Sequence, residues 1–301
     1  TVDIVNHMSG ENMLRAVSSE GELTINGEKW SLGGLEGQPE RGYLKLEWID
    51  EMTVADRSFI VEDFEISDSI HSLAWARSRW ALNKELPTGK SLTFTMRGTG
   101  DVSNLKVKLH FDIYDHVPVI RKHMEIFNES DEPVNLDSFK LEHLFFAEPE
   151  STEGDMSRRY LPNIHIESDY TMGGTFWEYT GDRTEHWTTD KEYTSQCNYG
   201  LNTLCTLDVY NEIGPDVEIT KDAPFSSYKV YEMPMDTYDR ERKGLFLRRF
   251  YRTIAPWTTE NPIFMHLTTI DEKIVKRAVD QCVEAGYEMI ILSFGSGMNA
   301  E

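Results

Sequence analysis

The C-terminal segment, residues 261–301, constrains the fold most because its pattern changes from strand to helix and back to strand. Residues 262–267 and 289–292 are two short apolar runs. Between them, apolar residues recur at helical spacing across residues 274–283. Because parallel strands need a crossover connection of this kind, the segment predicts a βαβ unit. One such unit cannot cover both faces of its own sheet, so we expect it to begin a larger α/β structure or to stack on another element.

The ends of this predicted helix also have sequence signals. Thr269 and Glu272 have the spacing of a capping box, in which the two side chains bond the first free backbone amides. Gly286 lies where a helix-ending glycine is expected. These signals predict a helix that begins after Thr269 and ends at Gly286, before the second strand, which runs into the glycine- and serine-rich loop at residues 293–297.

The chain before about residue 235 has a different pattern, that of β-strands. Its runs of alternating apolar and polar residues are 43–49, 59–66, 91–96, 105–114 and 119–127. Asn26-Gly27 between two further runs is a strong hairpin signal. Long strands with one solvated face, separated by turn formers, predict a mainly β fold with a large antiparallel sandwich.

Composition limits the partners and the location. The formal net charge of −22 opposes binding to nucleic acid and to anionic membranes. No run approaches the roughly 20 apolar residues of a membrane-spanning helix. The fraction of hydrophobic residues, 39%, is that of a globular chain. The location stays unknown, with a periplasmic or secreted one slightly favoured over a cytoplasmic one, and a homo-oligomer is possible.

The cysteines and motifs predict neither a cofactor nor a metal. The chain has three cysteines, too few for a disulfide scaffold, and no zinc-binding spacing. Cys197 and Cys205 either form a disulfide or remain reduced, and Cys282 fits the apolar face of the predicted helix. We find no phosphate loop, dinucleotide fingerprint or nucleophile elbow.

A charged amphipathic helix is predicted at residues 238–254, ended by Pro256. It divides the chain into a sandwich domain at 1–236, a linker helix at 237–257 and an incomplete βαβ segment at 258–301.

This organisation resembles the α-galactosidase (melibiase) family of glycoside hydrolases. The most specific matches are the charged linker with its continuation into the βαβ segment, residues 236–242, 248–256 and 259–262. Weaker matches lie at residues 30–35, 112–122 and 135–139. The resemblance implies an N-terminal super-sandwich, similar to galactose mutarotase, followed by a (β/α)₈ catalytic barrel of which only the start is present. It also implies an oligo- or polysaccharide substrate.

Two departures from the family pattern matter. The family's nucleophile and acid/base are aspartates that follow later barrel strands, so the resemblance assigns no catalytic residue in this chain. The family usually has paired aspartates, a glycine and a tryptophan after its second barrel strand, where this chain has residues 293–297, Ser-Phe-Gly-Ser-Gly. Serine hydroxyls cannot replace carboxylates that bind sugar hydroxyls, so this departure counts against galactose specificity.

Two groups of residues are candidate sugar contacts. The first lies at the ends of the predicted barrel strands, where barrel enzymes bind their substrates. It consists of His266, Ser293, Ser296 and Asn299. The alternative is that His266 is a structural histidine and that the loop only turns the chain.

The second group lies in the glycine-flanked stretch 173–187. Trp177 and Trp187 could stack on sugar rings, while Asp182 and Arg183 could bond hydroxyls. The alternative, that the tryptophans pack on the edge of the sandwich, is favoured.

Three hypotheses follow for the function. The chain is the N-terminal part of a carbohydrate-active enzyme, a non-catalytic carbohydrate-binding or interaction module, or a sandwich-only sugar epimerase that acts through a histidine and a carboxylate. His110, His116, His123 and His143 lie in or beside predicted strands. A structural role is favoured for all of them, and none can be selected as catalytic.

Overall fold

The computed structural model describes residues 3–68, 87–147, 161–170, 184–193, 200–255, 262–293 and 295–297. The contacts divide the chain into two compact units. The sandwich unit comprises Thr1–Ile70 and Thr88–Lys243, and the C-terminal unit comprises His71–Pro87 and Gly244–Glu301.

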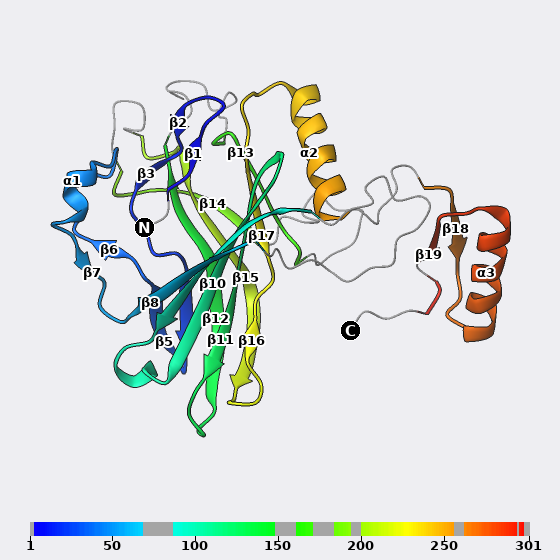
Figure 1. The fold of residues 1–301 in the computed structure, drawn as a ribbon, viewed down its shortest axis with the longest axis horizontal. Coiled ribbons are helices and arrows are strands. Elements are labelled where there is room, and N and C mark those ends of the chain that lie inside the picture. The colour runs from blue at the N-terminus through cyan, green and yellow to red at the C-terminus, as the bar shows by residue number, and fades with distance from the viewer. Residues whose placement is uncertain are drawn as a thin grey trace. The chain divides into compact units, whose positions relative to one another are not determined.

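The sandwich unit is mainly β, as predicted, and is built on one large sheet (Figure 1). One half of this sheet contains, in order, β14 (Glu185–Thr189), β15 (Leu204–Ile219), β12 (Val134–Phe146), β4 (Glu22–Ile25) and β5 (Glu28–Leu32), with β3 (Leu14–Ala16) beside β12. The other half contains β8 (Ser58–Ser67), β9 (Gly89–Arg97), β10 (Leu105–Tyr114), β11 (Val117–Asn128), β17 (Val230–Pro234) and β13 (Ile164–Ser168), with β16 (Phe225–Ser226) beside β11. The halves join through a parallel pair, β5 with β8, and the other pairs described in this unit are antiparallel.

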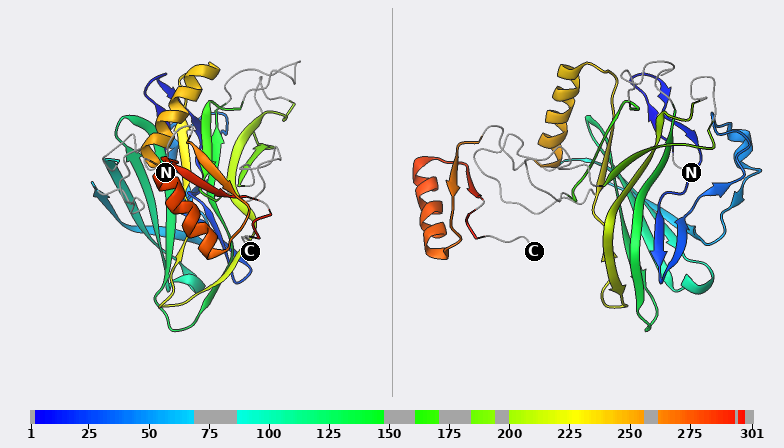
Figure 2. Two further views of the ribbon diagram at one scale, coloured as in Figure 1. Left: turned by 90° about the vertical axis from the view of Figure 1, so that its right-hand side faces the viewer. Right: turned by 180° about the vertical axis from the view of Figure 1, so that it is seen from behind.

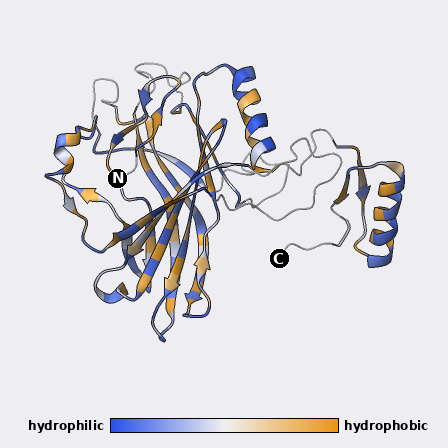
Figure 3. Ribbon diagram, viewed as in Figure 1, coloured by the Kyte–Doolittle hydropathy of each residue, from blue (hydrophilic) through white to orange (hydrophobic). Residues whose placement is uncertain are grey.

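The core lies between these two halves of the sheet. Hydrophobic and hydrophilic residues alternate along many of the strands (Figure 3), so each strand turns one face inward. Among the buried residues that form one cluster are Leu23, Leu136 and Leu207 from the first half and Leu109, Met124 and Val230 from the second. Burial of each such side chain stabilises the fold by about 1.5–3 kcal/mol, which is why the halves pack face to face.

Smaller elements complete the sandwich unit. They are the pair β1 (Val5–Asn6) and β2 (Glu11–Asn12), the pair β6 (Leu35–Glu36) and β7 (Thr53–Val54), the helix α1 (Leu46–Ile49) and the 3₁₀ turn η1 (Gly100–Val102).

The hairpin prediction is confirmed. Strands β4 and β5 pair antiparallel, and Ile25 faces Glu28 across the two-residue turn. Asn26 and Gly27 have φ angles of 49° and 81°, the positive values that a type I′ turn needs at both central positions.

The strand predicted at residues 43–49 is wrong. Residues 46–49 form helix α1, and Leu46 is 79% exposed. The rings of Tyr43 and Trp48 lie 5.3 Å apart, whereas an extended chain would separate these residues by about 17 Å. Contact between the two rings therefore accompanies a turned backbone, which the alternating pattern alone did not reveal.

The C-terminal unit contains the predicted βαβ arrangement. Strands β18 (Phe264–Leu267) and β19 (Met289–Leu292) pair parallel, and helix α3 (Glu272–Ala285) connects them (Figure 2). Helix α2 (Arg240–Ile254), the predicted linker helix, precedes them and begins at the end of the sandwich unit. The side chain of Asp239 accepts a hydrogen bond from the backbone amide of Arg242, which helps to start α2.

One predicted helix end is confirmed and the other is wrong. Gly286 ends α3 in the left-handed conformation, with φ of 76°. At the other end the cap is Asp271, whose carboxylate accepts hydrogen bonds from the backbone amides of Lys273 and Ile274. The Thr269 hydroxyl bonds the amide of Asp271 instead. A capping box at Thr269 would require the helix to begin two residues earlier.

Candidate functional site

The carboxyl ends of β18 and β19 carry the first group of predicted site residues. His266 is exposed, pairs in register with Ile291 and lies with its ring 5.5 Å from that of Phe264. The backbone amide of Ser293 donates a hydrogen bond to Leu267 O at 3.2 Å, and that of Ser296 donates to Ser293 O at 3.0 Å. The structure therefore brings His266 and Ser293 to the same edge of the strand pair, with Ser296 in the following turn.

The second predicted group is only partly described. Trp177, Asp182 and Arg183 lie outside the described residues, as does Asn299 of the first group. Trp187 lies in strand β14, half-buried, and its ring packs 5.4 Å from that of Phe146 in the core. The Trp187 ring therefore packs on the sandwich, and the residue lies in a strand and not in a loop.

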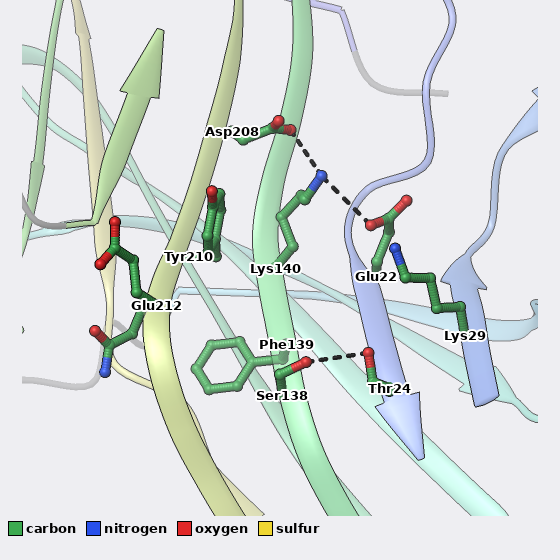
Figure 4. Close-up of a pocket in the computed structure, with 10 residues that line it drawn as sticks. Glu22, Thr24, Lys29, Ser138, Phe139, Lys140, Asp208, Tyr210 and Glu212 are labelled. Atoms are coloured by element: carbon green, nitrogen blue, oxygen red, sulfur yellow. Dashed lines mark hydrogen bonds and ion pairs between the residues drawn. The ribbon is translucent and has the colours of Figure 1, made fainter. Parts of the chain in front are cut away.

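A polar hollow on the sheet is the site that the sequence did not indicate (Figure 4). We call it the sandwich hollow, and its volume is about 340 Å³. Its walls come from four neighbouring strands, β5, β4, β12 and β15. The residues that line it are Glu22, Thr24, Lys29, Ser138, Phe139, Lys140, Asp208, Tyr210, Asn211 and Glu212. Ser138 and Lys140 lie two apart on β12, and Phe139 between them also lines the hollow, at a point where the pairing of β12 with β15 shifts register.

Lys140 organises the middle of the hollow. Its Nζ lies 3.0 Å from the Asp208 carboxylate and 3.4 Å from that of Glu22, so it links three strands (Figure 4). His143 Nδ1 lies 2.6 Å from the same Asp208 carboxylate. Burial alone raises the pKa of Asp208, but the hydrogen bond and charge of His143 and the charge of Lys140 together hold it below its ordinary value. Asp208 is therefore ionised at neutral pH, with its position fixed by two partners.

The rim of the hollow carries polar groups that no other described side chain engages. The side chains of Glu212 and Lys29 are exposed and make no hydrogen bond or ion pair with the described residues. The Tyr210 ring stacks on that of His186 at 4.0 Å, which fixes the position of the Tyr210 hydroxyl. Hydroxyl, carboxylate and ammonium groups in one hollow can both donate and accept hydrogen bonds.

A second polar cluster lies on β10 and β11. The rings of His110 and His123 stack 4.5 Å apart, and His110 also contacts Thr93 at 2.9 Å and Glu125 at 3.3 Å. His123 Nδ1 lies 3.9 Å from the fully buried Asp112 carboxylate. Burial, followed by the charge of His110, lowers the pKa of His123 to about 3. The His123 ring is therefore neutral at physiological pH, and the Asp112 carboxylate beside it accepts a hydrogen bond from Arg121 Nε at 2.7 Å.

The other two histidines have structural surroundings. His116 lies in the turn between β10 and β11 with φ of 66°, and His143 lies in β12, bonded to Asp208 as described above. Cys205 and Cys282 are buried free thiols, whereas Cys197 lies outside the described residues. Within the described part of the chain, no three histidine, cysteine, aspartate or glutamate residues are grouped to hold a metal. None of the described helices is long and apolar enough to cross a membrane.

Sequence reasoning missed the sandwich hollow because its residues are separated by more than 180 positions, from Glu22 to Glu212. Each contributing strand shows only the polar face expected of any strand exposed to water. The local signal is a pair of polar residues at alternate positions, such as Ser138 and Lys140. Such a pair does not distinguish a binding site from a strand face that is exposed to water.

Comparison with known proteins gives structural similarity alone. No family model matches the chain, and no curated protein matches it. Among solved structures, an α-galactosidase from Lactobacillus brevis is 14% identical with a TM-score of 0.42, covering 96% of this chain and 40% of its own. The α-galactosidases AgaA, in complex with 1-deoxygalactonojirimycin, and AgaB, both from Geobacillus stearothermophilus, are 13% and 12% identical, with TM-scores of 0.41 and 0.39. The match with AgaA covers 94% of this chain and 50% of AgaA. The match with AgaB covers 98% of this chain and 50% of AgaB. It thus spans half or less of these proteins.

Proposed function

We propose that this chain is the N-terminal portion of a carbohydrate-active enzyme that hydrolyses glycosides and resembles α-galactosidases. The observation that carries the proposal is the order of the elements. An antiparallel sandwich is followed in the same chain by helix α2 and then by a parallel βαβ unit. The charged linker at residues 236–242 and the residues that follow it give the family resemblance that supports this reading. The hydrolytic carboxylates lie outside this chain.

In this proposal β18 and β19 are the first two strands of a (β/α)₈ barrel, whose substrates bind at the carboxyl ends of the strands. His266 and Ser293 occupy such ends and offer an imidazole and a hydroxyl to sugar hydroxyl groups. Ser296 in the following turn and Asn299 are proposed as further contacts of this group. Trp177, Asp182, Arg183 and Trp187, which belong to the sandwich unit, are proposed as a second group of sugar contacts.

The test compares this chain with a longer parent protein that contains it. We expect the parent to hydrolyse aryl α-galactosides and the 301-residue chain to show no turnover, because hydrolysis needs two carboxylates on opposite sides of one bond. Raffinose and stachyose, which are bound in two structures of Geobacillus AgaA variants, are suitable oligosaccharide substrates. Release of the aryl group or of galactose is measured.

A variant of the parent examines the strand-edge residues. His266→Ala should raise KM for the glycoside more than it lowers kcat, since the imidazole is proposed to bind and not to react. Clear hydrolysis by the purified 301-residue chain, or a parent protein with no activity on any glycoside, would contradict the proposed function.

The stacked histidines of β10 and β11 raise a second candidate, a sugar epimerase confined to the sandwich, in which a histidine and a carboxylate would transfer the protons that interconvert sugar anomers. The low pKa makes His123 a weak base and Arg121 bonds Asp112, so this candidate is the less supported of the two. The 301-residue chain would then accelerate the mutarotation of galactose, followed by polarimetry, and His123→Ala would abolish the acceleration. His165→Ala is the matched control, because His165 lies on β13 and pairs with Glu167. A rate equal to that of buffer would exclude this candidate.

A further inference from the structure

We propose that the sandwich hollow is a binding site for a short, neutral saccharide, built from residues other than those at the ends of β18 and β19. The inference rests on the proposed function, because that function supplies the class of ligand. The position, charge and hydrogen bonding of the hollow supply the rest.

The charge of the hollow selects a neutral ligand. Three carboxylates, from Glu22, Asp208 and Glu212, face two lysines, Lys29 and Lys140. The balance is slightly negative, on a chain whose net charge is −22, so phosphates and other anions are repelled. Sugar hydroxyls both donate and accept hydrogen bonds and can therefore use carboxylates and ammonium groups together.

The floor of the hollow is organised before any ligand binds. Lys140 is held between Asp208 and Glu22, and Asp208 is held in turn by His143. The Ser138 hydroxyl donates to that of Thr24 at 3.0 Å. Side chains that are already fixed lose little entropy on binding, so they contribute more of their interaction energy to affinity. These residues are the frame of the site.

The rim supplies the groups that would contact the ligand. Glu212 and Lys29 have no side-chain partner among the described residues, so a ligand does not have to displace an ion pair to reach them. A carboxylate forms charge-assisted hydrogen bonds with hydroxyls. The volume of about 340 Å³ lies at the lower end of the range for small-molecule sites, which fits a short saccharide.

The experiment titrates the 301-residue chain with raffinose and with maltotriose and follows binding by saturation-transfer NMR. We expect millimolar affinity for at least one probe, because the hollow is open to solvent. Glu212→Gln and Tyr210→Phe should each weaken that binding by about fivefold or more. Glu218→Gln is the matched control and should leave the affinity unchanged, because Glu218 is also exposed on β15 but does not line the hollow.

Two results would overturn the inference. One is the absence of binding to both probes. The other is binding that is unchanged in both Glu212→Gln and Tyr210→Phe. If His266→Ala then abolishes this binding, the saccharide binds at the ends of β18 and β19 and not in the hollow. Failure here is distinct from failure of the proposed function, which is measured as turnover by the parent protein and not as binding by this chain.

Discussion

Lys122 Nζ lies 2.7 Å from the Glu142 carboxylate, and each of the two side chains is only 1% exposed. The pair joins β11 to β12 and thus connects the two halves of the sheet through the core. Glu20 lies 3.3 Å from the same Nζ, and Glu232 on β17 adds a third carboxyl group. Burial by itself lowers the pKa of Lys122, but these carboxyl groups together raise it, so the lysine is charged.

Removing this lysine should destabilise the sandwich strongly. Lys122→Met would leave the carboxyl groups of Glu142, Glu20 and Glu232 without their cation, at a cost of about 3–5 kcal/mol in the free energy of unfolding. Urea unfolding followed by circular dichroism measures this change. Adding Glu142→Gln to the variant should recover part of the loss, because the carboxyl group left without its lysine is replaced by a neutral amide. A loss below about 1 kcal/mol would show that the pair is not buried as described.

Stability should fall as the pH rises, because of Glu142. Burial, and next the charge of Glu232, raise the pKa of Glu142 well above its ordinary value. A carboxyl group with a raised pKa binds more protons in the folded state than in the unfolded chain, so its contribution is complete at low pH and is lost as the pH rises through the folded-state pKa. Melting temperatures from about pH 5 to about pH 9 should fall in the natural chain and fall less in Glu142→Gln. Parallel curves for the two proteins would contradict this.

Trp187→Ala should lower stability even in the absence of any sugar. The Trp187 ring packs on Phe146 and on the core cluster, so its loss opens space beside buried residues. Because Trp187 is only half-buried, we expect about 2–3 kcal/mol, below the range for a fully buried tryptophan. Trp187→Phe should keep most of the stability, and the melting temperature distinguishes the two variants. An unchanged melting temperature in Trp187→Ala would mean that the ring does not contribute to the packing.

The start of helix α3 depends on Asp271. Asp271→Ala removes a carboxylate that bonds two backbone amides and should cost about 1 kcal/mol of local helix stability. Hydrogen exchange of the amides in the first turn of α3 reports this directly. Thr269→Ala is the control and should have a smaller effect, because Thr269 bonds only the amide of Asp271. Equal effects in the two variants would restore Thr269 as a cap.

The features that sequence reasoning predicted depend on residues close together in the chain. Asn26-Gly27 specifies its hairpin because only such residues readily adopt two successive positive φ angles. The helical spacing at residues 274–283 and the glycine at 286 predicted α3 and its end for a similar reason. The error at residues 43–49 arose because alternation is a weak signal over seven residues when a ring contact such as that of Tyr43 with Trp48 favours a turn.

The sequence alone determined that the chain is mainly β and ends in a βαβ unit, because periodicity, turn residues and caps act over a few positions. Only the tertiary structure decided which polar side chains meet. Lys140, Asp208 and Glu22 converge in the sandwich hollow, and Lys122 meets Glu142 in the core, because strand pairing and the packing of the two halves bring distant segments together. That information lies in the register between strands and in the packing of the sheet, which no single strand contains.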